Sequence, residues 1–295
     1  MTSYPRFGGS DARRVDYAAA RCAILSAPYE GTVSYGGGTA RGPRAILQAS
    51  ANLEMYDEEL DRSIDLVGLH TLPPVDTADG SPEDVMQRIY EAALPPLRDG
   101  KLLVTLGGEH SISYGPFTAL REVLGSPFSI LQLDAHADLR PSYHGQKHSH
   151  ASIMARAHEL GLPFVQVGIR SLSAPERQFL RETGLEARVF WMHRLAQQQD
   201  DAWMDEVLEL LTDPVYVTID IDGLDPGLVP TTGTPEPGGL GWYQTLRLLR
   251  RVAERFHIPA FDLTELAPAP GFHAPDFLAA RLVYKLIGYA TQRAG

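Results

Sequence analysis

The sequence predicts an α/β fold in which a central, mostly parallel sheet of about eight strands lies between two layers of helices. Short apolar runs alternate along the chain with longer amphipathic segments, and this repeated strand–helix order is typical of parallel sheets with helices on both faces. Most of the runs show no polar–apolar alternation, which indicates strands that are buried on both faces. A closed eight-stranded barrel is the alternative architecture that the same pattern allows.

Eight strands and eight helices are expected, and no shift in composition marks a linker, so we expect one domain over residues 1–295. The expected strands are Cys22–Ser26, Asp65–Leu69, Leu102–Leu106, Ser129–Leu133, Phe164–Gly168, Arg188–Trp191, Val215–Ile219 and Pro259–Leu263. Several of the helices begin with a Ser or Asp cap or with Pro in the first turn. The expected helices are Pro43–Tyr56, Pro82–Leu97, Ser113–Leu124, Ser152–Leu160, Pro175–Glu182, Ala202–Leu211, Tyr243–Phe256 and Pro275–Thr291.

Charge and cysteine content limit the kinds of partner and of cellular compartment that are expected. The formal net charge is −11, which disfavours nucleic acid and acidic membrane surfaces but is compatible with a small cationic substrate. The single cysteine, Cys22, lies in an apolar run and has no intrachain partner, as expected of a protein in a reducing compartment. No run approaches 18 apolar residues and no secretory leader is recognised. We therefore expect a cytoplasmic location.

Side chains that bind metals gather after three of the expected strands. Residues 107–111 read Gly-Gly-Glu-His-Ser, residues 134–138 read Asp-Ala-His-Ala-Asp, and residues 220–222 read Asp-Ile-Asp. Ligands collect at the carboxyl ends of strands in α/β folds. Alternate residues of an extended chain share a face, so the acids within each of the last two motifs are expected to face one site. Carboxylates this close on buried strands require a cation.

The donor set indicates which metal is bound. Two imidazoles and four carboxylates are the expected ligands, namely His110, Asp134, His136, Asp138, Asp220 and Asp222. A hard, oxygen-dominated set suits Mn²⁺ better than structural Zn²⁺. Six ligands exceed what one ion takes once water is included, so we expect two Mn²⁺ per subunit. Water of lowered pKa between such ions is the expected nucleophile of a hydrolase.

These motifs resemble a known family. Residues 107–111, 134–138 and 218–222 look like the three signature motifs of the ureohydrolases, which comprise arginase, agmatinase and related guanidino and formimino hydrolases. The continuations at 223–226 and 233–239 are also similar, and residues 28–39 and 42–46 resemble agmatinases more than arginases. The resemblance implies an arginase-like three-layer fold, a homo-oligomer of three or six subunits, and cleavage of a guanidino group to urea and an amine.

The resemblance also assigns catalytic roles. His150 matches the histidine that shuttles protons, with His144 and His148 as nearby alternatives. Glu265 matches the acid that grips the substrate guanidinium, a pairing that a carboxylate can make through two parallel hydrogen bonds. Asp138 would relay a proton in addition to binding metal. Asp138, His150 and Glu265 are thus the expected catalytic residues, and His150 and Glu265 are expected to bind substrate.

Agmatine, cleaved to putrescine and urea, is the expected substrate. Residues 139–144 lack the small polar residues that bind the α-carboxylate in arginases, and Glu236 and Glu30 are candidates for binding the far ammonium. Arg140, if it faced the pocket, would instead favour a carboxylated substrate. Guanidinobutyrate, guanidinopropionate, arginine and formimidoylglutamate are the alternative substrates.

Two other classes of function are open. A non-catalytic binding module would be favoured by the loss of a ligand position, and none is lost. A two-metal phosphoesterase would need Arg or Lys beside the metals, where only Arg140 occurs.

Overall fold

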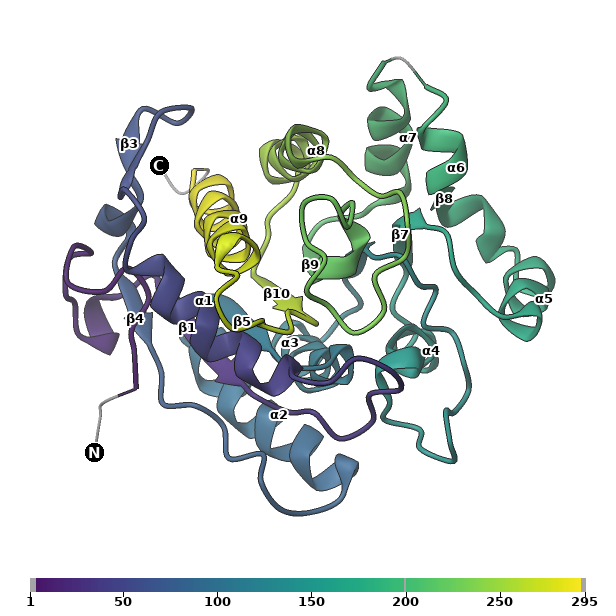
Figure 1. Ribbon diagram of the computed structural model, residues 1–295, viewed down its shortest axis with the longest axis horizontal. Coiled ribbons are helices and arrows are strands. Elements are labelled where there is room, and N and C mark those ends of the chain that lie inside the picture. Colours follow the sequence, from purple (N-terminus) through teal and green to yellow (C-terminus); the bar gives the residue numbers. More distant parts are fainter. Residues whose placement is uncertain (1–3, 199, 293–295) are drawn as a thin grey trace.

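The computed structural model describes residues 4–198 and 200–292 and contains an eight-stranded sheet of order β4-β1-β5-β10-β9-β6-β7-β8 (Figure 1). Every neighbouring pair of strands is parallel. The strands are β1 (Cys22–Ala27), β4 (Leu69–Thr71), β5 (Leu102–Gly107), β6 (Ser129–Leu133), β7 (Phe164–Ile169), β8 (Val189–Trp191), β9 (Val215–Asp220) and β10 (Ala260–Thr264). Over the described ranges β4 and β8 each pair with one strand only, so the sheet is open and the barrel alternative is wrong.

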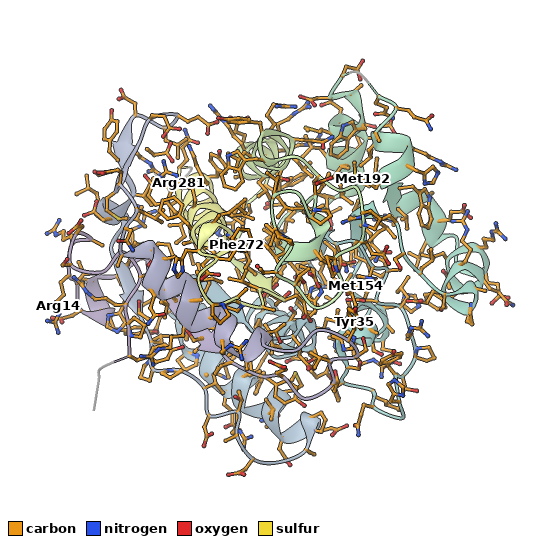
Figure 2. All side chains as sticks on the ribbon, in the orientation of Figure 1. Arg14, Tyr35, Met154, Met192, Phe272 and Arg281 are labelled. Carbon is orange, nitrogen blue, oxygen red and sulfur yellow. The ribbon has the colours of Figure 1, made fainter. Side chains whose placement is uncertain are left out.

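Helices cover both faces of this sheet, so the expected three-layer fold is confirmed. One layer holds α1 (Gly42–Ser50), α6 (Met192–Leu195), α7 (Ala202–Leu210), α8 (Trp242–Arg255) and α9 (Ala274–Ala290). The other holds α2 (Pro82–Arg98), α3 (Tyr114–Leu124), α4 (Ile153–Glu159) and α5 (Ala174–Glu182). Side chains fill the space between the layers, and the buried Met192 and Met154 belong to the two different cores (Figure 2).

Short elements connect these layers. The strands β2 (Tyr56–Asp57) and β3 (Arg62–Ser63) form a separate antiparallel hairpin. Single 3₁₀ turns occur at η1 (Tyr17–Ala19), η2 (Thr39–Arg41), η3 (Ile64–Val67), η4 (His110–Ser113), η5 (His150–Ser152), η6 (Leu185–Arg188) and η7 (Ile221–Gly223). No helix among the residues placed by the structure is long and apolar enough to cross a membrane.

Alternation of side chains explains the continuous apolar runs. On β9, Tyr216 belongs to the core beneath α2 and α3, whereas Val215 and Val217 belong to the core beneath α8 and α9. The central strands β5, β10, β9 and β6 therefore bury apolar side chains on both faces, as expected for a parallel sheet between helices.

Two expected elements are placed differently. The segment expected as the strand Asp65–Leu69 forms η3 instead, and β4 begins only at Leu69, because Gly68 adopts a left-handed backbone (φ 80°) between them. The helix expected over Pro43–Tyr56 ends at Ser50, whose hydroxyl donates to Leu47 O in the last turn and accepts from Gly8 N. The chain then turns into the β2–β3 hairpin.

Sheet order determines where the site lies. The four central strands, in order β5, β10, β9 and β6, are direct neighbours although they are far apart in sequence. Their carboxyl ends carry residues 107–111, 264–265, 220–222 and 134–138 respectively. All the motifs identified in the sequence therefore meet at one edge of the sheet.

Candidate metal centre

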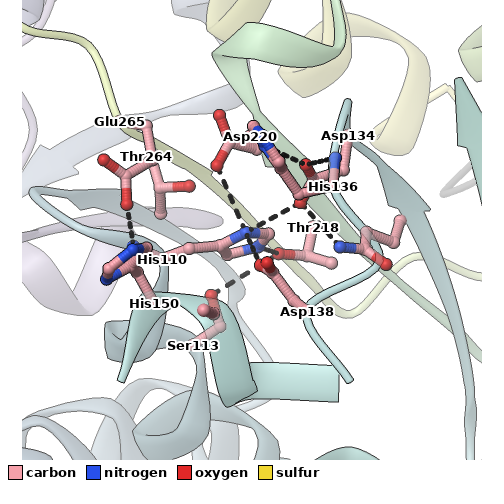
Figure 3. Close-up of polar contacts among 12 residues, drawn as sticks. His110, Ser113, Asp134, His136, Asp138, His150, Thr218, Asp220, Thr264 and Glu265 are labelled. Atoms are coloured by element: carbon pink, nitrogen blue, oxygen red, sulfur yellow. Dashed lines mark hydrogen bonds and ion pairs between the residues drawn. The ribbon is translucent and has the colours of Figure 1, made fainter. Parts of the chain in front are cut away.

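The six expected metal ligands lie together at the carboxyl ends of β5, β6 and β9. Figure 3 labels five of them, namely His110, Asp134, His136, Asp138 and Asp220. The Nδ1 atom of His110 is 3.1 Å from Asp134 Oδ2, 3.3 Å from Asp138 Oδ2 and 3.5 Å from Asp220 Oδ2. The Nδ1 atom of His136 is 3.0 Å from Asp222 Oδ2 and 3.7 Å from Asp134 Oδ1. The side chains thus form two clusters, and Asp134 presents one oxygen to each.

Each of the two clusters meets the geometric requirement for binding an ion. One contains His110, Asp134 and Asp138, the other contains Asp134, His136 and Asp222, and within each cluster the ligand atoms lie within 4.8 Å of one another. Asp220 faces the first cluster through His110. A carboxylate common to two clusters is the arrangement that lets one side chain bridge two ions.

Local backbone structure aims these side chains. Asp220 ends β9, but Asp222 lies in η7 and its N–H donates to Asp220 Oδ1 (2.9 Å). The expectation that both acids face the site from an extended chain is therefore wrong, because a 3₁₀ turn brings Asp222 round. Asp222 Oδ1 also accepts from Ala135 N (3.0 Å), which ties the second motif to the third.

A chain of buried hydrogen bonds sets the orientation of His110. Its Nε2 lies 2.8 Å from Thr218 Oγ1, and that hydroxyl donates to Asp262 Oδ1 (2.6 Å). Because the hydroxyl hydrogen points to Asp262, Thr218 accepts from His110 Nε2–H, and the Nδ1 lone pair is directed at the three carboxylates. Within the part of the chain that the structure describes, this buried Nδ1 has no hydrogen-bond partner. An oriented, unpartnered imidazole nitrogen backed by a hydrogen-bonded carboxylate is the usual arrangement of a metal-binding histidine.

The electrostatics of the site favour the binding of a cation. Burial, and then the charges of Asp138 and Asp222, raise the pKa of Asp134 to about 7. Burial and the neighbouring Asp222 and Asp134 hold the pKa of Asp220 well above its ordinary value. Four buried aspartates at this spacing repel one another unless protons or cations neutralise them. The donor set and this repulsion both fit divalent ions with a preference for oxygen ligands.

A cavity of about 230 Å³ opens above these clusters and is lined by Asp138, Asp220, Asp222, His150 and Glu265, among others. Glu265 follows β10 and its Oε1 accepts from His110 N (2.6 Å). Glu265 and Asp138 both have left-handed backbones, with φ of 65° and 52°. Such conformations are uncommon for residues with a side chain and tend to occur at functional sites. The structure thus brings Glu265 and Asp138 to the same cavity as the candidate ligands.

Of the three histidines considered for proton transfer, His150 lines the cavity. His148 packs instead against Tyr114, with ring centroids 4.5 Å apart, and its burial lowers its pKa. His144 is an exposed residue of a loop and has a left-handed backbone. The geometry therefore favours His150 over its two neighbours.

The N-terminal loop reaches the cavity, although not through the residue considered in the sequence. Glu30 accepts hydrogen bonds from Gly38 N and Ala40 N, so it holds the loop together and does not line the cavity. Val33, Ser34 and Tyr35 line it instead. Tyr35 is 86% exposed although it contributes to the lining.

Arg140 lies at the cavity wall with its charge partly balanced. Its Nε is 3.9 Å from Glu176 Oε2, and its guanidinium carbon is 5.1 Å from the centre of the Tyr143 ring. Glu236, the other acid considered in the sequence, is not among the residues that line the cavity, although its Oε1 is 3.8 Å from Nε2 of His136, which does line it. The wall therefore presents both signs of charge.

Several buried or half-buried polar residues that support the site were missed in the sequence. Thr218 and Asp262 orient His110, and Glu109 binds the backbone of residues 31 and 32. Arg170 donates to a group of backbone carbonyls around the third motif, those of residues 168, 222, 223, 224 and 236. Polar residues inside apolar strands, as in Val-Thr-Ile and Phe-Asp-Leu, were the available signal for the first two.

Fold and site together define the class: a parallel α/β/α protein with a buried histidine–aspartate centre at the carboxyl ends of its central strands. The chain belongs to the arginase family, whose sequence profile matches residues 20–288. It is 39% identical over 279 residues to an N(1)-aminopropylagmatine ureohydrolase of Synechocystis, covering 92% of this chain and 90% of that one. The protein of the same name from Thermus thermophilus is 42% identical, with 98% and 96% covered.

Solved structures agree with this assignment. The agmatine ureohydrolase of Thermoplasma volcanium superposes with a TM-score of 0.85 at 29% identity, over 98% of this chain and 95% of that one. The expected ureohydrolase family, arginase-like fold and enzyme class, a hydrolase acting on amidines, are confirmed.

Proposed function

We propose that this protein uses two Mn²⁺ ions to hydrolyse agmatine to putrescine and urea. The observation that carries the proposal is the pair of ligand clusters that share Asp134 directly beneath a cavity bearing Glu265. In the proposed site, His110, Asp134 and Asp138 would hold one ion, and Asp134, His136 and Asp222 would hold the other. Asp220, which faces His110, completes the set.

When bound, two such ions would lower the pKa of a water between them and polarise the substrate. The four carboxylates match the charge of two divalent cations. Manganese, rather than zinc, is proposed because the donors are mostly hard oxygens and thiolate is absent from the cluster.

The remaining roles belong to the chain's own side chains. Glu265 would accept hydrogen bonds from the planar guanidinium of the substrate, which a carboxylate can grip with both oxygens. Asp138, which lines the cavity, would take the proton that the attacking water gives up as it adds to the guanidinium carbon, and would pass it to the amine that leaves when the carbon–nitrogen bond breaks. His150, on the cavity wall, would exchange that proton between the leaving amine and solvent.

The cavity wall supports a substrate with a cationic far end. Arg140 is paired with Glu176 and packs near Tyr143, so its charge is partly satisfied by the protein itself. Glu236 adds a further carboxylate near His136. N(1)-aminopropylagmatine is a second candidate substrate, favoured by the names of the Synechocystis and Thermus relatives. Both compounds share the guanidinobutyl-amine portion that this site would bind.

One assay tests the proposal directly. Urea release is measured from agmatine, N(1)-aminopropylagmatine, arginine, guanidinobutyrate and guanidinopropionate, with and without added Mn²⁺, beside metal analysis of the protein. We expect Mn²⁺-dependent turnover of one or both of the first two and two ions per chain. Absence of turnover on every guanidine at full manganese loading would refute the proposal.

Two variants separate binding of metal from binding of substrate. Glu265→Gln should keep both ions and lose turnover, whereas Asp220→Ala should lose both metal and activity. A homo-oligomer of three or six subunits and a cytoplasmic location complete the proposal, and light scattering of the purified protein tests the first.

A further inference from the structure

We propose that Thr32 is a positioning residue that fixes the tautomer of His150. In that tautomer Nδ1 carries the hydrogen, and Nε2 is left with its lone pair free to exchange a proton in the cavity. The link to catalysis rests on the proposed function, because it takes His150 as the proton-exchanging group. The tautomer itself rests only on hydrogen bonds between residues of this chain.

The first step concerns Glu109, whose side chain is completely buried. Its Oε2 accepts from Gly31 N (2.8 Å) and Thr32 N (2.7 Å). Its Oε1 faces the hydroxyls of Thr32 (2.8 Å) and Ser111 (2.5 Å). A carboxylate in this position can only accept. The hydroxyl hydrogen of Thr32 is therefore donated to Glu109.

The second step follows from the geometry on the other side of that hydroxyl. Thr32 Oγ1 lies 3.2 Å from His150 N and 3.1 Å from His150 Nδ1. The backbone N–H can only donate to it. Because the hydroxyl hydrogen of Thr32 already points to Glu109, the contact with Nδ1 is a hydrogen bond only if Nδ1 is the donor.

A neighbouring hydroxyl does not reverse this assignment. Ser149 Oγ also approaches His150 Nδ1, but at 3.5 Å, the outer limit of a hydrogen bond, whereas Thr32 Oγ1 is 3.1 Å away. Thr32 is closer and contacts both the ring and the backbone of His150. We therefore assign the tautomer to Thr32 and include Ser149 in the test.

A carboxylate–threonine–histidine chain of hydrogen bonds occurs twice in this site, and the two chains place the imidazole hydrogen on different ring nitrogens. Asp262, through the hydroxyl of Thr218, places the hydrogen of His110 on Nε2 and directs Nδ1 at the acids. Glu109, through the hydroxyl of Thr32, places the hydrogen of His150 on Nδ1. Thr32 and His150 are 118 residues apart, so the N-terminal loop is what completes this second chain of hydrogen bonds.

Nuclear magnetic resonance reads the tautomer without any turnover. Protein with ¹⁵N-labelled histidine is loaded with diamagnetic Mg²⁺, and the His150 signals are assigned by their loss in His150→Asn. We expect the wild-type ring, in its neutral form, to show Nδ1 protonated, and Thr32→Val to shift the ring toward the Nε2–H tautomer. Thr32→Ser should keep the wild-type pattern, as should Ser149→Ala. The proposal is overturned by an Nε2–H ring in the wild type, or by an unchanged ring in Thr32→Val.

Kinetics test the consequence. Thr32→Val should lower kcat by about 10- to 100-fold, part of the roughly 10²- to 10⁴-fold that a well-placed acid–base group contributes, with KM within about twofold of the wild type. Thr32→Ser should recover most of the loss. Thr183→Val, the same change at an exposed site on the far end of α5, is the matched control and should leave kcat unchanged.

A combined variant separates positioning from a general structural effect. In a His150→Asn background, Thr32→Val should cost almost nothing more, whereas equal losses in both backgrounds would contradict the role assigned to Thr32. If the wild type cleaves no guanidine at all, the proposed function fails, and the resonance experiment still decides the tautomer.

Discussion

Replacing Thr218 with valine removes one hydroxyl from the centre of the site without changing the size of the side chain. Thr218, His110 and Asp262 are each fully buried. Thr218 Oγ1 accepts from His110 Nε2–H at 2.8 Å and donates to Asp262 Oδ1 at 2.6 Å. In Thr218→Val both of these groups lose a partner in an environment that water does not reach.

The magnitude follows from those two lost bonds. An unsatisfied buried polar group costs about 1–3 kcal/mol, so two such groups give about 2–6 kcal/mol. Ser113, whose hydroxyl lies 3.4 Å from Thr218 Oγ1, can move to replace part of the loss. We therefore expect Thr218→Val to lower the free energy of unfolding of the metal-free protein by about 2–4 kcal/mol. Metal affinity should fall by about 10- to 100-fold, the usual effect of removing a partner behind a metal-binding histidine.

The chain offers a closely matched control in Thr105. It lies on β5 directly beside Asp262, on the opposite side from Thr218. It is also fully buried, and among the residues that the structure places its hydroxyl has no hydrogen-bond partner. Thr105→Val should therefore leave stability and metal affinity unchanged or slightly improved. Urea denaturation and Mn²⁺ titration by calorimetry measure both quantities. Equal behaviour of the two variants would refute the reasoning.

Three further predictions follow from the same geometry. Asp134→Asn should lose both ions because Asp134 belongs to both clusters, whereas His136→Asn should retain one ion. Metal analysis after gel filtration measures the number of ions in each variant. Wild-type metal content in Asp134→Asn would contradict the proposal that both ions share this carboxylate. Without metal, the folded protein holds extra protons. Burial raises the pKa of Asp134 to about 7, and although burial disfavours charged His136, its bond to Asp222 raises the pKa of that imidazole to about 10. Both pKa values lie above those of the unfolded chain, so stability is lost between about pH 4 and 7 through Asp134 and between about pH 6.5 and 10 through His136. The melting temperature of the metal-free protein should therefore fall as pH rises from about 6.5 to about 10. Added Mn²⁺ should abolish this fall, and a rise without metal would contradict the sign. Arg170→Lys should lower the free energy of unfolding by about 2–4 kcal/mol, measured by urea denaturation, because an ammonium cannot span the carbonyls that the guanidinium joins. Arg188→Lys loses one bond to Leu210 O and should lower it by about 1 kcal/mol or less. Equal losses in the two variants would contradict a role for Arg170 in joining these carbonyls.

The strands were predictable because burial on both faces produces a continuous apolar run in the sequence. The run Val215–Ile219 was expected as a strand, and β9 is Val215–Asp220. The failure at residues 65–69 has a local cause, since Gly68 divides that apolar run into a turn and a short strand. Strand order was not predictable in the same way. β5 and β6 follow one another in sequence, yet β10 and β9 lie between them.

The grouping of the candidate ligands was predictable because their positions are local in sequence. The candidate ligands sit in three short motifs, so their grouping at one edge could be inferred from the rule on strand ends. The residues that orient them depend on pairings that the sequence does not reveal. Thr218 meets Asp262 because β9 pairs with β10 in that register. Thr32 meets His150 because the N-terminal loop reaches the cavity, and no periodicity encodes that contact.

The distribution of buried charge supports the proposal that this site binds a cationic guanidinium. The carboxylates of Asp262 and Glu109 are occupied by hydroxyl and backbone donors of the chain itself. The four aspartates of the two clusters match two divalent cations. Glu265 differs from both groups. In the described structure its carboxylate receives one hydrogen bond, from His110 N, and burial together with the charges of Asp220 and Glu109 holds its pKa well above the ordinary value.

A buried carboxylate with free acceptor positions is costly unless a cation reaches it. Glu265 also has a left-handed backbone, so the fold holds this acid at the cavity despite a local conformational cost. A guanidinium supplies both the charge and the paired donors that such an acid lacks, whereas a neutral amide would supply donors alone. In the proposed function, Glu265 would therefore select the charged, planar end of the substrate, and discrimination among guanidino compounds would be left to the opposite charges of Arg140 and Glu176 on the wall.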